Sequence, residues 1–256
     1  TARHLPHPNP QAGRIMSSAR SEEVVLFPQS LLTAAAHPDP YPYYAALLAY
    51  RPIYREHRLG LWVALGAREV ADVLSSAAVR VRPLEEPVPS AIAGAPAGEI
   101  FKNLERMNDG PRHAQAKPRV RGCLAAIDAA QIAAIARREA AALARTLAMQ
   151  HRRRIDSFNF ALPVRTVAQM IGLPEESAGR CPALIGDFVR CLSPLSTPDE
   201  IARSNRAAES LLQVLRDEWR RSGHGGLAAQ VERLRDLDLD TSDAVLANLV
   251  GFMSQT

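Results

Sequence analysis

The clearest chemical pattern in the 256-residue sequence is a pair of basic side chains on one face of an expected helix. Asn108 or Asp109 can cap this helix, and Pro111 suits its first turn. His113 and Lys117 are four residues apart and therefore share a helical face. Together they could bind carboxylates or phosphates through charge-assisted hydrogen bonds. A solvated basic helix start is the alternative interpretation of the same residues.

The other nucleophilic and metal-ligating residue types form no recognisable motif. Cys123, Cys181 and Cys191 include no CxxC pair and no metal-ligand spacing, so we interpret each as a lone packing or surface residue. The histidines lack partners at zinc-ligand spacing, and the sequence contains no glycine-rich phosphate loop and no G-x-S-x-G motif. The sequence therefore predicts no catalytic residue and no metal ligand.

Composition limits the class of protein. Hydrophobic residues make up 47% and charged residues 23%, which excludes a chain disordered throughout. Aromatic residues are only 5% and alanine recurs in runs, which favours helices over a β-sandwich. The net charge of +4 is too small to indicate nucleic-acid binding, and no apolar run reaches the roughly 20 residues of a membrane span. Unpaired cysteines favour a reduced, cytoplasmic protein.

The N-terminal half is expected to contain short elements. A helix begins near Tyr41, two strands over 53–57 and 61–65 form a hairpin, and a helix follows over 67–75. Residues 79–99 are rich in proline, alanine and glycine, and we expect them to form a long loop. Helices dominate the rest of the chain.

Three amphipathic helices are expected over 129–150, 160–172 and 199–221. A fourth helix begins at Thr241 and is apolar nearly all round, so it should be central and buried. No later segment of the chain could cover it. We therefore expect it to expose an apolar surface that promotes self-association.

The run from Asp109 to His113, with Lys117, resembles a helix of the haem-thiolate monooxygenases, the cytochrome P450 family. Further segments follow that family's order: residues 39–48, the hairpin, residues 160–174 and the helix from Asp243. The resemblance covers about residues 25–256 as one P450-like domain, and residues 1–24 are expected to be a flexible tail.

The resemblance implies a mainly α fold with a small β-hairpin region, ending inside the family's long central helix. His113 and Lys117 would bind the haem propionates, and residues 79–99 and 183–198 would border the substrate pocket. The activity implied is insertion of oxygen from O₂ into a small organic substrate, with electrons from a redoxin-type donor.

The sequence departs from the family pattern in three places. Lys117 replaces an arginine, so a bidentate contact becomes a point-charge contact, and Pro118 is expected to kink the helix. The family's haem-ligand cysteine loop is missing, so the 256 residues alone are expected to be inactive. The oxygen-activating motif would fall at or beyond Thr256, and we interpret Ser254 as a packing hydroxyl.

Two other classes of protein fit the same sequence. One is a haem-free helical binding or scaffolding protein derived from the same fold. The other is a helical nucleic-acid-binding regulator, which rests only on the basic isoelectric point and the arginine runs. The family resemblance favours the monooxygenase over both.

Overall fold

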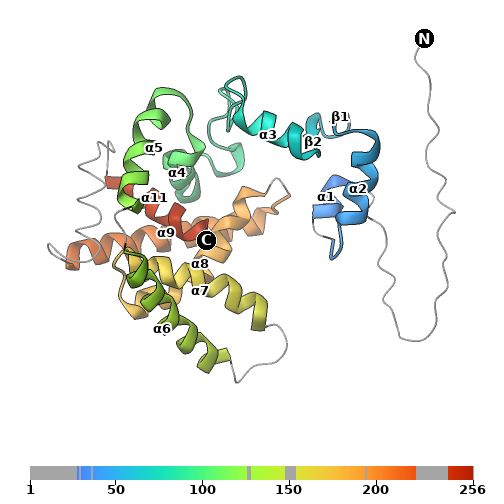
Figure 1. The fold of residues 1–256 in the computed structure, drawn as a ribbon. Helices are drawn as coiled ribbons and strands as arrows, with labels where there is room; N and C mark the ends of the chain where they lie inside the picture. The colour runs from blue at the N-terminus through green and yellow to red at the C-terminus, as the bar shows by residue number, and fades with distance from the viewer. Residues whose placement is uncertain are drawn as a thin grey trace, which may run out of the picture. The chain divides into compact units, whose positions relative to one another are not determined.

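The computed structural model describes residues 28–222 and 242–255, except residues 29, 36, 126–127, 148–153 and 194. The expected boundary between a tail and a domain at residues 24 and 25 lies outside the described residues. The chain divides into two compact units, Thr1–Val79 and Arg80–Thr256, which we call the first and second unit. Figure 1 shows the element order along the chain, and each unit is described by itself.

The first unit has the predicted helix–hairpin–helix order, preceded by one short helix that the sequence did not indicate. Its elements are α1 (Leu31–Ala35), α2 (Tyr41–Tyr50), β1 (Ile53–Glu56), β2 (Leu61–Ala64) and α3 (Ala67–Ser75). The strands pair antiparallel, and Gly60 turns the chain with a φ of 67° that favours glycine. The hairpin prediction is confirmed.

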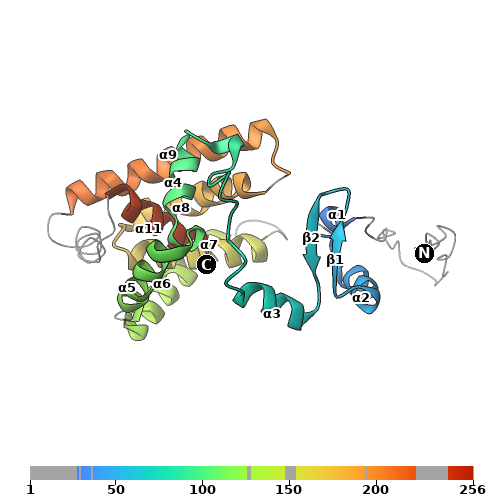
Figure 2. The same ribbon diagram turned by 90° about the horizontal axis from the view of Figure 1, so that it is seen from above.

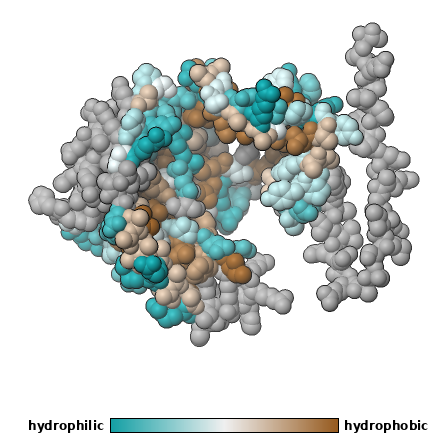
Figure 3. Space-filling model, viewed as in Figure 1, coloured by the Kyte–Doolittle hydropathy of each residue, from teal (hydrophilic) through white to brown (hydrophobic). Residues whose placement is uncertain are grey.

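One face of the hairpin is open. The register pairs Ile53 with Ala64 and Arg55 with Trp62, so these four side chains share a face. Ile53 is 49% exposed and Trp62 72% exposed. Hydrophobic residues are accordingly visible among hydrophilic ones on the surface shown in Figure 3. Among the described residues of the first unit, Ala34 is the only buried hydrophobic residue in the core.

The described part of the second unit is mostly helical, as the alanine-rich composition predicts. Its elements are η1 (Ser90–Ile92), α4 (Pro96–Asn103), η2 (Glu105–Met107), α5 (Gly110–Ala125), α6 (Ala129–Leu147), α7 (Arg154–Met170), α8 (Glu175–Phe188), η3 (Val189–Leu192), α9 (Pro198–Arg221) and α11 (Ser242–Ser254). The expected helices are confirmed, although α7 begins before residue 160 and α8 was not predicted. Among the described helices, none has the length and apolar character that a membrane span requires.

The prediction that residues 79–99 form one long loop is wrong at its C-terminal end. The 3₁₀ turn η1 and the start of α4 fall in this segment, and Ile92 and Ala97 are buried. Gly98 allows this packing, because a Cβ there would lie 2.0 Å from the carbonyl oxygen of Ile92. Pro96, which suggested a loop, instead begins α4, and Gly98 allows the backbone of α4 to lie close to Ile92.

The hydrophobic core of the second unit forms around α11, which Figures 1 and 2 show among the neighbouring helices. This helix packs against α4, α7 and α9. Its side chains Val245, Leu246, Leu249, Val250 and Met253 are each at most 1% exposed. The helix is therefore central and buried, as predicted. The expectation that it exposes an apolar surface is wrong, because the earlier helices cover it.

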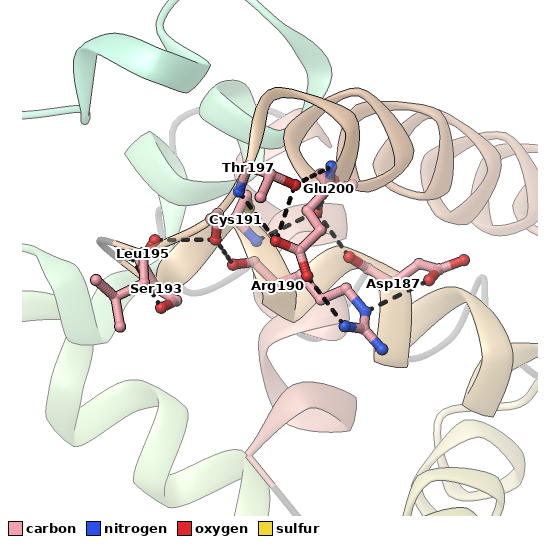
Figure 4. Close-up of polar contacts among 9 residues, drawn as sticks. Asp187, Arg190, Cys191, Ser193, Leu195, Thr197 and Glu200 are labelled. Carbon is pink, nitrogen blue, oxygen red and sulfur yellow. Dashed lines mark hydrogen bonds and ion pairs between the residues drawn. The ribbon is translucent and has the colours of Figure 1, made fainter. Parts of the chain in front are cut away.

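The connection between α8 and α9 is fixed by polar contacts, shown in Figure 4. Thr197 and Glu200 form a reciprocal capping box at the start of α9. Hydrogen bonds from Thr197 lower the pKa of the Glu200 carboxyl. Arg190 bridges Glu200 at 3.3 Å and Asp187 at 3.8 Å. The end of α8 is thereby tied to the first turn of α9.

Candidate functional site

The segment before α5 is held by two side chains that the sequence suggested as caps. The Asn108 amide donates to the carbonyl oxygen of Leu104 at 2.7 Å and accepts from Arg82 Nη2 at 2.6 Å. The Asp109 carboxylate accepts from the backbone N–H of Val81 at 3.0 Å. These contacts fix where α5 begins, and with it the position of its first turn.

His113 lies in that first turn and faces η2. Its Nδ1 lies 3.2 Å from the carbonyl oxygen of Glu105 and 3.6 Å from Oε1 of the same residue. A carbonyl can only accept, so Nδ1 donates, and the ring keeps Nε2 as its second polar atom. The His113 side chain is 30% exposed, while the Glu105 side chain is 8% exposed. The imidazole is thus oriented by a buried partner and is partly exposed.

Lys117 lies one turn further along α5 and is exposed. No ion pair or hydrogen bond of Lys117 is found among the described residues. The helix continues through Pro118 to Ala125. The structure therefore places the two predicted residues on one helix, the first held by Glu105 and the second in solvent.

Asn248 of α11 is a part of this arrangement that sequence reasoning missed. Its Oδ1 accepts from the backbone N–H of Glu105 at 2.9 Å. Its Nδ2 donates to the carbonyl oxygens of Asn103 at 3.0 Å and Ala244 at 2.8 Å. The available signal was an asparagine inside an otherwise apolar, buried helix, because such an amide must find hydrogen-bond partners.

The two cysteines with described side chains are buried and free. Burial raises the pKa of the Cys181 thiol to about 11 and also raises the pKa of Cys191. Burial therefore favours the protonated form of both thiols. This agrees with their interpretation as packing residues.

A groove of the second unit lies beside α6 and has a volume of about 680 Å³. Its inner wall holds Glu139, which accepts hydrogen bonds from Arg165 and Gln169. Gln169 in turn accepts from Arg138. Within the described ranges, no group of three His, Cys, Asp or Glu side chains is arranged to hold a metal ion. Ser254 donates to the carbonyl oxygen of Gly251 at 3.0 Å, as a packing hydroxyl does.

Comparison with known proteins finds similarity in structure alone. No family model matches the chain, and no curated protein matches it in sequence. The crystal structure of CalO2 superposes with a TM-score of 0.70 at 20% identity, covering 90% of this chain and 58% of CalO2. P450BioI, in complex with hexadec-9Z-enoic acid ligated acyl carrier protein, gives 0.66 at 18% identity, covering 84% of this chain and 57% of P450BioI.

CalO2 and P450BioI are cytochromes P450, and the similarity extends over nearly all of this chain. The chain therefore has a cytochrome P450-like, mainly α fold with a small β-hairpin. It spans between one half and two thirds of the length of either protein. The identities of 18% and 20% show the fold, and they do not assign an activity.

Proposed function

We propose that this chain supplies part of a haem-dependent cytochrome P450 monooxygenase, an oxidoreductase that inserts oxygen from O₂ into a small organic substrate. The observation that carries the proposal is the fold, shared with CalO2 over 90% of the chain. In this proposal, residues 79–99 and 183–198 border the substrate pocket. The 256 residues by themselves are expected to be inactive.

The side chains on α5 fit the carboxylates of haem. With Nδ1 donating to Glu105, His113 in its imidazolium form has Nε2–H as a donor for an anion. Lys117 offers an exposed ammonium with three donors. We propose that these two residues bind the propionates. When bound, haem supplies the chemistry of O₂ activation. Cys181 and Cys191 are packed within the hydrophobic core, and we assign the axial ligand to neither.

The partners are part of the same proposal: a small-molecule substrate and a redoxin-type electron donor, with no nucleic acid and no membrane. P450BioI was crystallised with a fatty acid ligated to an acyl carrier protein. A carrier-bound substrate is therefore the first alternative to a freely diffusing one. We place the protein in the cytoplasm, because the buried free thiols of Cys181 and Cys191 suit a reducing compartment.

The second candidate is a haem-free helical binding or scaffolding protein of the same fold. The burial of α11 against α4, α7 and α9 is what such a protein would also have. Both candidates share the fold, so only a measurement of haem binding separates them.

The test is to express the complete open reading frame that contains this sequence, add haemin, and record the spectrum of the reduced, CO-bound protein. The monooxygenase proposal expects the red-shifted Soret band of a haem–thiolate protein, and the 256 residues alone are expected to lack it. Replacing His113 or Lys117 with alanine should weaken haem retention by about 1–3 kcal/mol each. A complete, folded protein that takes up no haem would support the scaffolding candidate.

A further inference from the structure

Asn248 is a buried polar side chain on a helix whose other inward residues are apolar. It is 6% exposed, and it lies between Val245 and Leu249, which are at most 1% exposed. Three backbone partners surround it, one N–H and two carbonyl oxygens. This set fixes the amide orientation, because only Oδ1 can accept from the N–H and only Nδ2 can donate to the carbonyls.

The backbone that Asn248 binds leads directly to His113. Asn248 holds the N–H of Glu105 at 2.9 Å and the carbonyl oxygen of Asn103 at 3.0 Å, on both sides of the turn from α4 into η2. The carbonyl oxygen of Glu105 then accepts from His113 Nδ1 at 3.2 Å and from the N–H of Asn108 at 3.1 Å. The residue whose N–H is held by α11 is therefore the residue whose carbonyl oxygen orients the imidazole of α5, through two adjacent peptide units joined at the Glu105 Cα.

We propose that Asn248 is a positioning residue, which acts through Glu105 to keep His113 Nδ1–H donating to the Glu105 carbonyl oxygen, so that the Nε2–H of the imidazolium form faces an anionic ligand. This role rests on the proposed function, in which the anion is the haem propionate bound by His113. The position of α11 is passed to His113 through two hydrogen bonds and the backbone of Glu105.

A merely structural role is the rival explanation, and Asn205 provides the matched control. Asn205 lies on α9, and its Oδ1 accepts from the backbone N–H of Ala97 at 3.2 Å. It therefore also ties one helix to α4, but at the opposite end of α4 from Glu105. Loss of this hydrogen bond should lower the stability of the fold without changing the orientation of the His113 ring.

The experiment measures the side-chain ¹⁵N chemical shifts of His113 in the haem-free 256-residue chain, assigned with a His113→Gln variant. In the unchanged chain, neutral His113 is expected as the Nδ1–H tautomer. In Asn248→Ala, it should relax toward the tautomer mixture of a solvated histidine, and hydrogen exchange at the Glu105 amide should accelerate at least about tenfold. Asn205→Ala should change neither quantity.

Unchanged His113 shifts in a folded Asn248→Ala variant would overturn the proposal, as would equal changes in Asn205→Ala. If Asn248→Ala does not fold, the same two measurements on the unchanged chain test the proposal. An Nε2–H tautomer or an unprotected Glu105 amide there contradicts the role, and the Nδ1–H tautomer together with a protected amide supports it. Haem is absent from this measurement, so its outcome is independent of whether the complete protein binds haem.

Discussion

Glu139 is an ionisable side chain with only 2% of its surface exposed, on the wall between α6 and α7. Arg165 and Gln169 of α7 both donate to its carboxylate. A buried carboxylate without such partners is strongly destabilising, whereas the pair itself contributes little net stability. The pair therefore fixes how α6 and α7 pack together. Removal of one partner should lower the stability, because the other partner then stays buried without its hydrogen bonds.

The first prediction concerns this pair. Arg165→Met keeps much of the side-chain volume but leaves the Glu139 charge without its cation, so it should lower the free energy of unfolding by about 3–5 kcal/mol. Urea denaturation measures this. Arg68→Met is the control, because Arg68 and Asp72 are 89% and 72% exposed and their pair is expected to contribute less than about 1 kcal/mol. Equal effects of the two substitutions would show that the Glu139 pair is not buried.

The second prediction concerns the pH dependence of stability. The pKa of Cys181 is raised from 9.0 to about 11 in the folded chain, because burial penalises the thiolate. Between these two values the folded state holds a proton that the unfolded state releases, so this contribution to stability is complete below pH 9 and is lost as pH rises toward 11.

Cys181→Ala should therefore flatten the decline of unfolding free energy in this alkaline window, by up to roughly 2 kcal/mol. Denaturation curves of the variant and the unchanged chain are measured at several pH values. The tyrosines and lysines are common to both proteins, so their titration cancels in the difference between the two. Parallel declines in the two proteins would mean that Cys181 does not contribute.

At the scale of elements, hydrophobic periodicity predicted most helices and the hairpin correctly. It failed at α4, because proline, alanine and glycine at residues 94–98 resemble a loop in composition. Their helical role depends on a tertiary contact, the approach of Gly98 to the carbonyl of Ile92, that no local pattern encodes. It also failed on the surface of α11, since an apolar helix does not reveal which neighbours cover it.

The third prediction tests the two kinds of helical glycine. Gly98→Ala should destabilise by about 1–3 kcal/mol, because its methyl group would collide with the carbonyl of Ile92 and force the backbone of α4 away from η1. Gly122→Ala in α5 meets no atom within 4 Å and should stabilise by about 0.5–1 kcal/mol. Thermal unfolding of both variants gives the comparison, and a stabilising Gly98→Ala would contradict this packing of α4.

At the scale of the whole molecule, the sequence predicted the fold class and the shared helix of His113 and Lys117. It did not predict the partners of His113. Glu105 is close in sequence, but its orientation comes from Asn248, 143 residues away, and pairs so distant are determined only by tertiary packing. Local spacing thus predicted that His113 and Lys117 share a helical face, whereas the contacts that hold His113 depend on the tertiary packing and were not predictable.

The last prediction concerns where the stability of the molecule resides. All core-cluster residues lie in the second unit, between Ile92 and Met253, and Leu249 of α11 is 1% exposed among them. Leu249→Ala should lower the free energy of unfolding by about 2–5 kcal/mol through lost contacts and a cavity. Leu74→Ala in α3 removes a side chain that is already 82% exposed and should cost less than about 0.5 kcal/mol.

The two tryptophans report this transition differently. Trp219 packs against the core, whereas Trp62 is 72% exposed in the folded chain. The Trp62→Phe variant should therefore keep nearly all of the fluorescence change on unfolding, and the Trp219→Phe variant should lose most of it. Leu249→Ala should move the midpoint of the Trp219 signal to lower denaturant. A midpoint that responds equally to Leu74→Ala would show that stability is not concentrated around α11.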